Sequence, residues 1–294
     1  MERFILPRNL VEAAARDARG VWMSALPEVV GELAERWSLK VYDPFQPGGD
    51  TAWVAPVEGP AGERLVLKVV WRHPEAEHEA DGLAVWAGRG AVRLHAADSS
   101  DGTLALLLER CVPGTELRTI AEPDQDVVVA GLLQQLWVEP AEGHHFRPLS
   151  VMCEQWADRF DEDLADVGTA TWTQLDPGLV REAMALFREL PKTAERETLL
   201  CTDLHAGNVL VAEREPWLAI DPKPYVGDPT YDPLQHMLNC EGRLRADPRA
   251  LAFRMASLLD LDRNRLCSWL FARCVQFAPS WPWLAEVAGS IAPR

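Results

Sequence analysis

The fold is decided by the sequence LLCTDLHAGNVLV at residues 199–211 and, after a charged turn, by WLAIDPK at residues 217–223. Two short apolar runs on either side of a polar turn predict a β-hairpin. Asn208 precedes the first predicted strand, and Asp221 follows the second. Because a hairpin brings its two ends together, we expect this amide and this carboxylate to lie side by side, with Asp203 one short loop away.

These three polar residues suit phosphoryl transfer. That reaction needs a base to orient a hydroxyl group and hard oxygen ligands for magnesium. Asp203 and Asn208 stand five positions apart, which is the spacing of the base and a metal ligand in kinase catalytic loops. Asp221 would then be the second metal ligand. The alternative is a surface hairpin whose acids have no function, but the combination of spacing, hairpin and second aspartate favours a catalytic site.

The same residues carry a resemblance to a known family. The run DLHAGN at residues 203–208 resembles the D-L-H-x-G-N loop of the aminoglycoside phosphotransferases, small-molecule relatives of the protein kinases. The later run at residues 217–223, with GDPTYD at residues 227–232, looks like the branch of streptomycin 6-kinases and hydroxyurea phosphotransferases. The resemblance extends from about Leu26 to the C-terminal helices.

The chain departs from this family directly before Asp203. The family usually has His or Trp followed by Gly, whereas this chain has Cys201 and Thr202. In the family, the Asp-rich turn that here contains Asp228 and Asp232 braces the catalytic loop and carries no chemistry.

The resemblance implies an α+β fold of the two-lobed protein-kinase type. Residues 1–108 would form a small, mostly antiparallel β lobe that binds the nucleotide. Residues 109–114 would form the hinge, and residues 115–294 a larger, mainly helical lobe for catalysis and substrate binding. ATP is expected to lie between the two lobes.

A lysine within an apolar strand is the main nucleotide-binding candidate. Lys68 lies within the run RLVLKVV at residues 64–70, and a buried strand rarely holds an unpaired lysine. The kinase signature places such a lysine on the α- and β-phosphates, paired with a helical glutamate. Residues 73–86 predict that helix, on which Glu75 and Glu79 share a face. We prefer Glu79, which is closer to the apolar part of the helix, but Glu75 stays open.

Two further segments are expected to contact ATP. Gly48, Gly49, Asp50 and Thr51 lie between two predicted strands, at residues 39–45 and 52–57. Glycines there can bring backbone N–H groups close to phosphate, although an ordinary hairpin turn explains them as well.

The second segment follows the apolar strand at residues 104–108 and enters the expected hinge. Adenine would bond there to backbone groups of Glu109 and Cys111. Side-chain identity matters little for such bonds, so this assignment rests on position in the chain.

Composition limits the possible partners. The chain has 294 residues, of which 48% are hydrophobic and 25% charged, with a net charge of −16. This charge disfavours nucleic acid and anionic membranes as partners. It is compatible with a cationic small molecule, although solubility alone is the better explanation of the net charge. We see no signal peptide and no apolar run of about 18 residues. The six cysteines form no C-x-x-C motif, so we expect a cytoplasmic protein with reduced thiols.

An acidic helical face is the candidate site for the acceptor. Asp158, Glu162 and Asp166 recur at intervals of four in a predicted helix at residues 151–166, which places them on one face. Such a run is commonly a solvated surface, and the alternative is an electrostatic trap for a cationic substrate.

The resemblance implies ATP- and magnesium-dependent phosphorylation of a hydroxyl group on a streptomycin-type aminocyclitol, and hence antibiotic resistance. Hydroxyurea, a sugar and a biosynthetic intermediate are alternative acceptors. A nucleotide-binding pseudokinase is the alternative of another class, which the presence of Lys68, Asp203, Asn208 and Asp221 argues against.

Overall fold

The chain folds into two compact units in a computed structural model, which describes residues 4–16, 19–100, 102–165 and 175–293. The first unit comprises Met1–Gly114 and Val211–Pro216, and the second comprises Thr115–Leu210 and Trp217–Arg294. The segment Val211–Pro216 is the tip of the predicted hairpin. It belongs to the first unit, whereas the sequence analysis placed it in the second lobe.

The first unit is built around an antiparallel sheet with strand order β1-β2-β3-β5-β4. Its elements are α1 (Arg8–Arg16), α2 (Gly20–Arg36), β1 (Lys40–Val41), β2 (Ala52–Glu58), β3 (Arg64–Trp71), the 3-10 turn η1 (Pro74–Ala76), α3 (Glu79–Trp86), β4 (Leu94–Ser100) and β5 (Thr103–Glu109). The expected strands at residues 52–57, 64–70 and 104–108 therefore form β2, β3 and β5. Of the expected strand at residues 39–45, only β1 forms.

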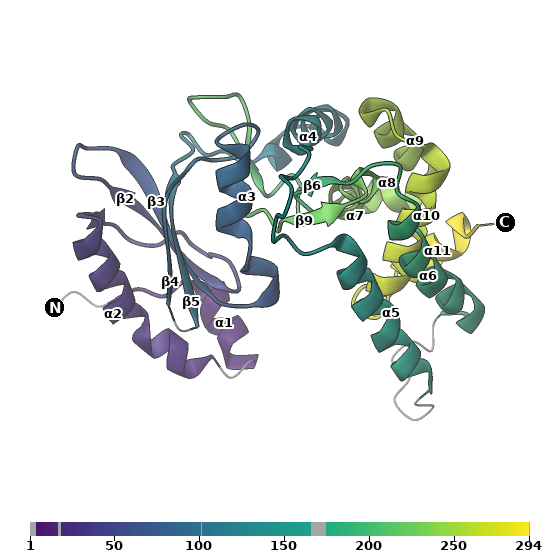
Figure 1. The fold of residues 1–294 in the computed structure, drawn as a ribbon, viewed down its shortest axis with the longest axis horizontal. Coiled ribbons are helices and arrows are strands. Elements are labelled where there is room, and N and C mark those ends of the chain that lie inside the picture. The colour runs from purple at the N-terminus through teal and green to yellow at the C-terminus, as the bar shows by residue number, and fades with distance from the viewer. Residues whose placement is uncertain (1–3, 17–18, 101, 166–174, 294) are drawn as a thin grey trace. The chain divides into compact units, whose positions relative to one another are not determined.

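Helices α1 and α2 cover one face of this sheet, and α3 lies on the opposite face (Figure 1). The core on the first face joins side chains at alternate strand positions to the two helices: Trp53, Ala55, Val57, Leu65, Leu67, Val69, Ala105 and Leu107 pack with Leu10, Leu26, Val30 and Leu33. Because successive side chains of a strand point to opposite faces, Lys68 points away from this core and toward α3.

Helix α2 begins at Gly20 and continues through Pro27. Because proline suits the first position of a helix, the sequence predicts a break near Pro27, and that prediction is wrong. The contacts of Arg19, directly before α2, give a physical reason for the start of this helix. The Arg19 guanidinium lies 4.5 Å from the centre of the Trp71 ring and donates a 2.8 Å hydrogen bond to the carbonyl of Asp50, which draws the chain toward the end of the sheet.

The expected helix at residues 73–86 is also divided. Pro74 opens the 3-10 turn η1, and α3 begins only at Glu79. Glu75 therefore lies in an exposed turn and does not share a helical face with Glu79.

The second unit is mainly helical. Its elements are the 3-10 turn η2 (Leu117–Thr119), α4 (Glu122–Leu136), α5 (Leu149–Ala165), α6 (Pro177–Glu189), the 3-10 turn η3 (Pro191–Thr193), β6 (Thr198–Leu200), β7 (Val209–Leu210), β8 (Leu218–Ala219), β9 (Tyr225–Gly227), the 3-10 turn η4 (Pro229–Tyr231), α7 (Leu234–Asn239), α8 (Glu241–Ala246), α9 (Pro248–Leu259), α10 (Arg263–Phe277) and α11 (Leu284–Ile291). Its strands form two small antiparallel sheets, β6–β9 and β7–β8.

Helix α10 is the centre of this unit's core and packs against α6, α9 and α11. Its Trp269 is fully buried, with ring centres 6.2 Å from Phe187 of α6 and 5.2 Å from Tyr231 of η4. The helical core therefore reaches directly to the Asp-rich turn that follows β9.

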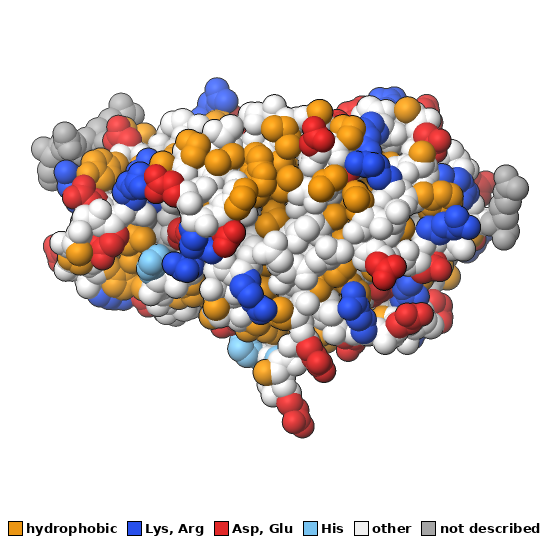
Figure 2. Space-filling model, turned by 90° about the horizontal axis from the view of Figure 1, so that it is seen from above, with side chains coloured by type: hydrophobic (Ala, Val, Ile, Leu, Met, Phe, Trp, Pro, Cys, Tyr) orange, Lys and Arg blue, Asp and Glu red, His pale blue; other side chains and the backbone are white. Residues whose placement is uncertain are grey.

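Charges are mixed on the surface. Figure 2 shows acidic and basic side chains interspersed over the face that it draws, so the described residues there do not gather the net charge of −16 into one acidic field. Among the described residues, no helix combines the length and the apolar character that crossing a membrane requires.

Candidate active site

The predicted hairpin forms and places two polar residues at its open end. Val209 pairs with Ala219 and Leu210 with Leu218, and the Ile220 N–H donates to the Asn208 carbonyl at 2.9 Å. Asn208 thus stands immediately before the first paired position, and Asp221 directly follows Ile220, which donates to Asn208. Asp221 has a φ of 52°, a left-handed conformation that turns the chain out of the strand.

The loop before the hairpin is held by its own backbone. The Asn208 N–H donates to the His205 carbonyl at 2.8 Å, and Asn208 Nδ2 donates to the carbonyl of Asp203 at 3.1 Å. The Gly207 N–H donates to His205 Nδ1 at 3.1 Å. Burial lowers the pKa of His205, against the raising effect of Asp203. A lowered pKa agrees with a neutral ring whose Nδ1 accepts a hydrogen bond.

A buried carboxylate fixes the two residues before Asp203. Asp232 accepts hydrogen bonds from the N–H groups of Cys201, at 3.1 Å, and Thr202, at 2.6 Å. It also accepts one from Trp137 Nε1 at 2.9 Å. Complete burial raises the pKa of Asp232 to about 6, although the three donors act in the opposite direction. Asp232 therefore braces the loop that carries Asp203.

The other acid of the turn ties it to α10. Asp228 Oδ2 accepts hydrogen bonds from Arg265 Nε and Trp269 Nε1, both at 2.7 Å. Its Oδ1 accepts from the Thr230 N–H at 2.9 Å and so caps η4. Both acids thus bind structural donors, as the resemblance implies for this turn.

Lys223 is a site residue that the sequence analysis did not single out. Its Nζ lies 2.6 Å from Asp203 Oδ2 and 3.7 Å from Asp221 Oδ2. The only sequence signal is its place two positions after Asp221, within the stretch that decides the fold.

In the first unit, Lys68 pairs with Glu79. Lys68 Nζ lies 2.6 Å from both carboxylate oxygens of Glu79, and the side chains are 9% and 3% exposed. The pair joins the middle of β3 to the first residue of α3. The sequence left both Glu75 and Glu79 as possible partners of Lys68, and in the structure the partner is Glu79.

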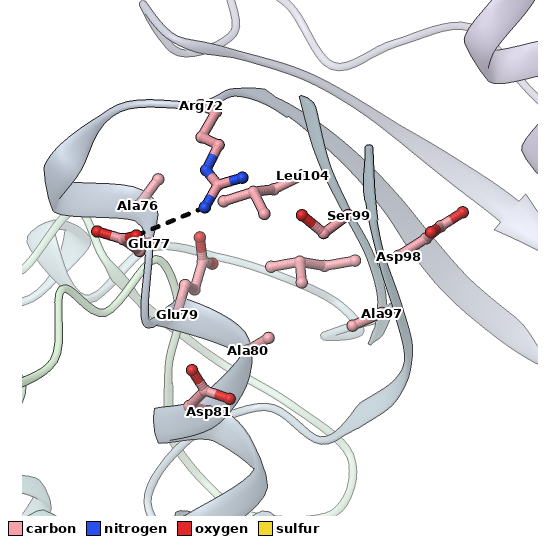
Figure 3. Close-up of a pocket in the computed structure, with 11 residues that line it drawn as sticks. Arg72, Ala76, Glu77, Glu79, Ala80, Asp81, Ala97, Asp98, Ser99 and Leu104 are labelled. Atoms are coloured by element: carbon pink, nitrogen blue, oxygen red, sulfur yellow. Dashed lines mark hydrogen bonds and ion pairs between the residues drawn. The ribbon is translucent and has the colours of Figure 1, made fainter. Parts of the chain in front are cut away.

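A pocket of about 240 Å³ lies beside this pair, between α3 and the strands β4 and β5 (Figure 3). Its polar lining consists of Arg72, Glu77, Glu79, Asp81, Asp98 and Ser99. Arg72 reaches across the rim to Glu77, at 3.5 Å. Three of its four carboxylates lie next to a cation: Glu77 next to Arg72, Glu79 next to Lys68 and Asp98 next to Arg36. The pocket is therefore lined mainly by paired charges.

The glycine-containing loop is attached to the N-terminal segment. Gly48 has a φ of 77°, and an added Cβ there would lie 2.4 Å from Pro7, so this position requires glycine. The Gly48 carbonyl accepts from Asn9 Nδ2 at 2.9 Å, and the Asp50 carbonyl accepts from Arg19. These bonds engage carbonyl groups of the loop. Contacts of Gly48, Gly49, Asp50 and Thr51 with phosphate stay a prediction.

At the expected hinge, the side chain of Glu109 has a structural partner. Arg214, in the hairpin tip, donates to its two oxygens at 2.8 and 2.9 Å. Burial raises the pKa of Glu109, but hydrogen bonds from Arg214 and the Arg93 N–H outweigh it, and the pKa is lowered. The Glu109 N–H donates to the Arg93 carbonyl at 2.9 Å. That N–H is therefore already engaged, and adenine contacts through the backbone of Glu109 and Cys111 stay a prediction.

The expected acidic face is partly neutralised. Arg188 of α6 lies 2.8 Å from Asp158 and also pairs with Glu154 at 2.9 Å and Asp161 at 2.8 Å. Asp158 therefore already has a cationic partner, and its contact with an acceptor stays a prediction. Glu162 is exposed on the same helix, and Asp166 lies outside the described residues.

A buried cluster of one aspartate, one histidine and one cysteine does not suit a metal. The buried side chains of Asp126, His236 and Cys240 lie within 4.8 Å of one another. Asp126, however, accepts hydrogen bonds from Arg243 at 2.8 Å and from Arg254 at 2.6 Å. Two guanidinium groups already neutralise this carboxylate, which makes the cluster a structural junction.

Comparison with solved structures identifies the fold. The choline kinase LicA from Streptococcus pneumoniae matches with a TM-score of 0.59 and 13% identity, over 90% of this chain and 95% of that chain. The macrolide 2'-phosphotransferase MphH from Brachybacterium faecium matches with a TM-score of 0.55 and 17% identity, over 91% of this chain and 98% of that chain. With an antiparallel β unit and a helical unit, the chain has the kinase-like α+β fold that the sequence predicted.

Comparison of sequences identifies the family. Residues 36–286 match the model of the aminoglycoside/hydroxyurea antibiotic resistance kinases. A hydroxyurea phosphotransferase from Kitasatospora aureofaciens is 38% identical over 92% of this chain and 78% of its own length. A streptomycin 6-kinase from Streptomyces glaucescens is 34% identical over 93% of this chain and 89% of its own length.

The chain belongs to this family of antibiotic resistance kinases. It is a phosphotransferase that acts on a hydroxyl group of a small molecule.

Proposed function

We propose that the chain transfers the γ-phosphoryl group of ATP, with magnesium, to a hydroxyl group of an aminoglycoside or aminocyclitol such as streptomycin, and that this modification confers resistance. The observation that carries the proposal is the loop and hairpin that present Asp203, Asn208 and Asp221 together. The relative named streptomycin 6-kinase supports the choice of acceptor.

In this proposal Asp203 is the base. Its carboxylate accepts a hydrogen bond from the acceptor hydroxyl and takes the proton as the oxygen attacks phosphorus. The new O–P bond forms while the γ-phosphorus separates from the oxygen that bridges it to the β-phosphorus. The electron pair of the broken bond leaves with ADP. Such catalysis consists mainly of positioning and electrostatic stabilisation. The bracing of the loop by Asp232 supports this role, because it fixes the backbone on which Asp203 stands.

Asn208 and Asp221 fit a magnesium ion. Both offer oxygen donors, as this hard cation prefers, and the hairpin holds them at one open end. The Nδ2 of Asn208 is bound to the Asp203 carbonyl, so the amide oxygen is the atom left to serve as a ligand. Magnesium bound there would neutralise negative charge on the phosphates.

In the first unit, Lys68 would steady the α- and β-phosphates, with its ammonium oriented by Glu79. Gly48, Gly49, Asp50 and Thr51 would approach the phosphates, and Glu109 and Cys111 would bind adenine through the backbone. Burial and the nearby Glu109 raise the pKa of the Cys111 thiol to about 12. That thiol is therefore neutral at physiological pH.

Hydroxyurea is a second candidate acceptor. The specific observation in its favour is the relative named hydroxyurea phosphotransferase, which is 38% identical to this chain. A sugar or biosynthetic intermediate, or a pseudokinase that only binds nucleotide, has no such observation behind it.

A phosphorylation screen with labelled ATP tests the proposal. Streptomycin, other aminoglycosides, hydroxyurea and simple sugars would be offered to the wild type and to Asp203→Ala, with and without magnesium. We expect label on streptomycin and a rate about 10²- to 10⁴-fold lower in the variant, while calorimetry still detects ATP binding. Nucleotide binding without transfer to any acceptor would contradict the proposal and favour the pseudokinase.

A further inference from the structure

The ammonium of Lys223 lies next to both acids that the proposed chemistry requires. Its Nζ lies 2.6 Å from Asp203 Oδ2 and 3.7 Å from Asp221 Oδ2. The Lys223 side chain is 23% exposed and that of Asp203 20% exposed, whereas that of Asp221 is 43% exposed. The cation is thus partly shielded from water and still reachable by a ligand.

The backbone of Lys223 does not depend on this side chain. The Lys223 N–H donates to the Cys201 carbonyl at 2.9 Å, and the Lys223 carbonyl accepts from Thr202 Oγ1 at 2.6 Å. These two bonds already hold the turn against the loop. The position of the backbone therefore does not by itself require a lysine here.

The proposed reaction explains why a lysine stands at position 223. An attacking hydroxyl must lie within about 2.6–3.2 Å of the base, and the phosphorus about 3–3.5 Å beyond the hydroxyl oxygen. The transferred group must also lie on the side where Asp221 would bind metal. Those conditions place it beside Asp203 and Asp221, where Nζ already lies. During transfer, charge spreads over the three equatorial oxygens of this group, and a cation at that place stabilises it.

We infer that Lys223 is a catalytic residue whose ammonium contacts the transferred phosphoryl group, an inference that rests on the proposed function. Before substrates bind, the same ammonium holds the Asp203 carboxylate in place. In the transfer, the proton of the acceptor hydroxyl passes to Asp203 and the Pγ–O bond electrons pass to ADP. Lys223 keeps its proton throughout and supplies a donor to a phosphoryl oxygen.

The test compares Lys223→Ala and Lys223→Arg with the wild type, using whichever of streptomycin and hydroxyurea the wild type phosphorylates. Lys192→Ala is the matched control, because Lys192 is exposed in η3. We expect kcat of Lys223→Ala to fall about 10²- to 10³-fold, as for other donors that stabilise a transition-state oxygen. Lys223→Arg should recover part of the loss, and the control should match the wild type.

A binding measurement separates contact with the phosphoryl group from a purely structural role. ADP with aluminium fluoride imitates the group in transfer, whereas ADP alone lacks it. The wild type should bind the mixture more tightly than ADP. Lys223→Ala should lose most of that difference while keeping its ADP affinity within about 3-fold, because only interactions special to the transition state are removed. Its melting temperature should stay above the assay temperature, so that both proteins are folded when binding is measured.

The outcomes are distinct. A wild-type kcat in Lys223→Ala overturns the inference and leaves the proposed function standing. A lowered kcat with an intact preference for the aluminium fluoride mixture also overturns it, since Lys223 then acts only by positioning Asp203. A wild type that phosphorylates neither acceptor contradicts the proposed function itself, and the inference falls with it.

Discussion

At the scale of single residues, Asp232 shows how burial and hydrogen bonding oppose each other in the loop. Its side chain is completely buried and accepts three N–H donors, which favour the carboxylate. Burial favours the neutral acid and prevails, so the pKa rises from 3.8 to about 6. The native state therefore holds a proton at pH values where the unfolded chain has already released it.

This pKa shift predicts a specific dependence of stability on pH. A folded pKa above the unfolded value gives stability that is fully present below about pH 4 and is lost as the pH rises to about 6. The effect is best seen as the difference between the wild type and Asp232→Asn, measured by urea unfolding at several pH values. We expect the advantage of the wild type to shrink from pH 4 to 6 and to stay level above it. A difference that does not change with pH would contradict the raised pKa.

Thr202 illustrates what the sequence could not give at this scale. Its φ is 52°, a conformation that a β-branched residue rarely adopts and that suits the glycine usual in the family at this position. The strain is offset by the hydrogen bonds to Asp232 and to the Lys223 carbonyl. Spacing alone predicted Asp203, Asn208 and Asp221 as neighbours in the fold. The hydrogen bonds of Thr202 to Asp232 and to Lys223 depend on where the chain after the hairpin meets the loop. No local sequence pattern encodes that position.

At the scale of elements, β3 and α3 are joined by one buried ion pair. Lys68→Ala should lower activity through misplaced phosphates, and Glu79→Ala should lower it less. The double variant should lose much less than the sum, with an interaction energy of about 1–3 kcal/mol from kcat/KM for ATP. Glu75→Ala is the matched control, because Glu75 is exposed in η1, and it should behave like the wild type. Additive losses would show that the two side chains act independently.

The hairpin tip gives a second prediction at this scale. Arg214 binds both oxygens of Glu109 and the carbonyl of Gly88 at 2.7 Å. Arg214→Ala leaves a carboxylate that is only 17% exposed without its main partner, so we expect a loss of about 1–3 kcal/mol in the free energy of unfolding.

Arg64→Ala is the control for this prediction, because it removes the exposed pair of Arg64 with Glu213 in the same tip. Arg64 and Glu213 are 54% and 64% exposed, and such pairs contribute at most about 1 kcal/mol. Urea denaturation followed by tryptophan fluorescence compares the two. Equal effects would mean that burial of Glu109 does not decide the result.

Elements are predictable where one pattern covers many residues. Apolar residues recur at helical spacing in α4, α6, α9 and α10, and apolar runs form β3 and β5. The sheet formed by β6 and β9 was missed, because each strand has three residues and its partner lies across the catalytic hairpin. Strand β4 lies at an edge of the sheet, and its partly buried residues alternate with exposed ones. It was missed because it contains no apolar run.

At the scale of the whole molecule, the net charge of −16 includes acidic groups that contain a cation of their own. On α5 and α6, three carboxylates share the single guanidinium of Arg188, which leaves an excess of two negative charges. Asp158 and Glu154 raise the pKa of Arg188, so that cation is permanent. What the sequence suggested as an open acidic face is therefore a partly compensated network with Glu162 exposed beside it.

The last prediction concerns the acceptor and follows from this charge. Streptomycin-type acceptors carry guanidino groups and are polycations at neutral pH, so a negative helical face attracts them. Screening shortens this attraction to about 8 Å at physiological ionic strength. We therefore expect the KM for streptomycin to rise with added salt while the KM for ATP changes little. Glu162→Gln should raise the KM for streptomycin about 2- to 5-fold, as removal of one exposed charge does.

Glu28→Gln, at an exposed position of α2, removes the same charge elsewhere and should leave this KM unchanged. Asp158→Asn should have a smaller effect than Glu162→Gln, since Arg188 already neutralises much of the charge that it removes. If hydroxyurea or another neutral molecule proves the better acceptor, and its KM does not respond to salt, the acidic face is only solvated surface. The choice of a cationic acceptor would then be wrong, although the proposed roles of Asp203, Asn208 and Asp221 would stand, because none of them depends on the charge of the acceptor.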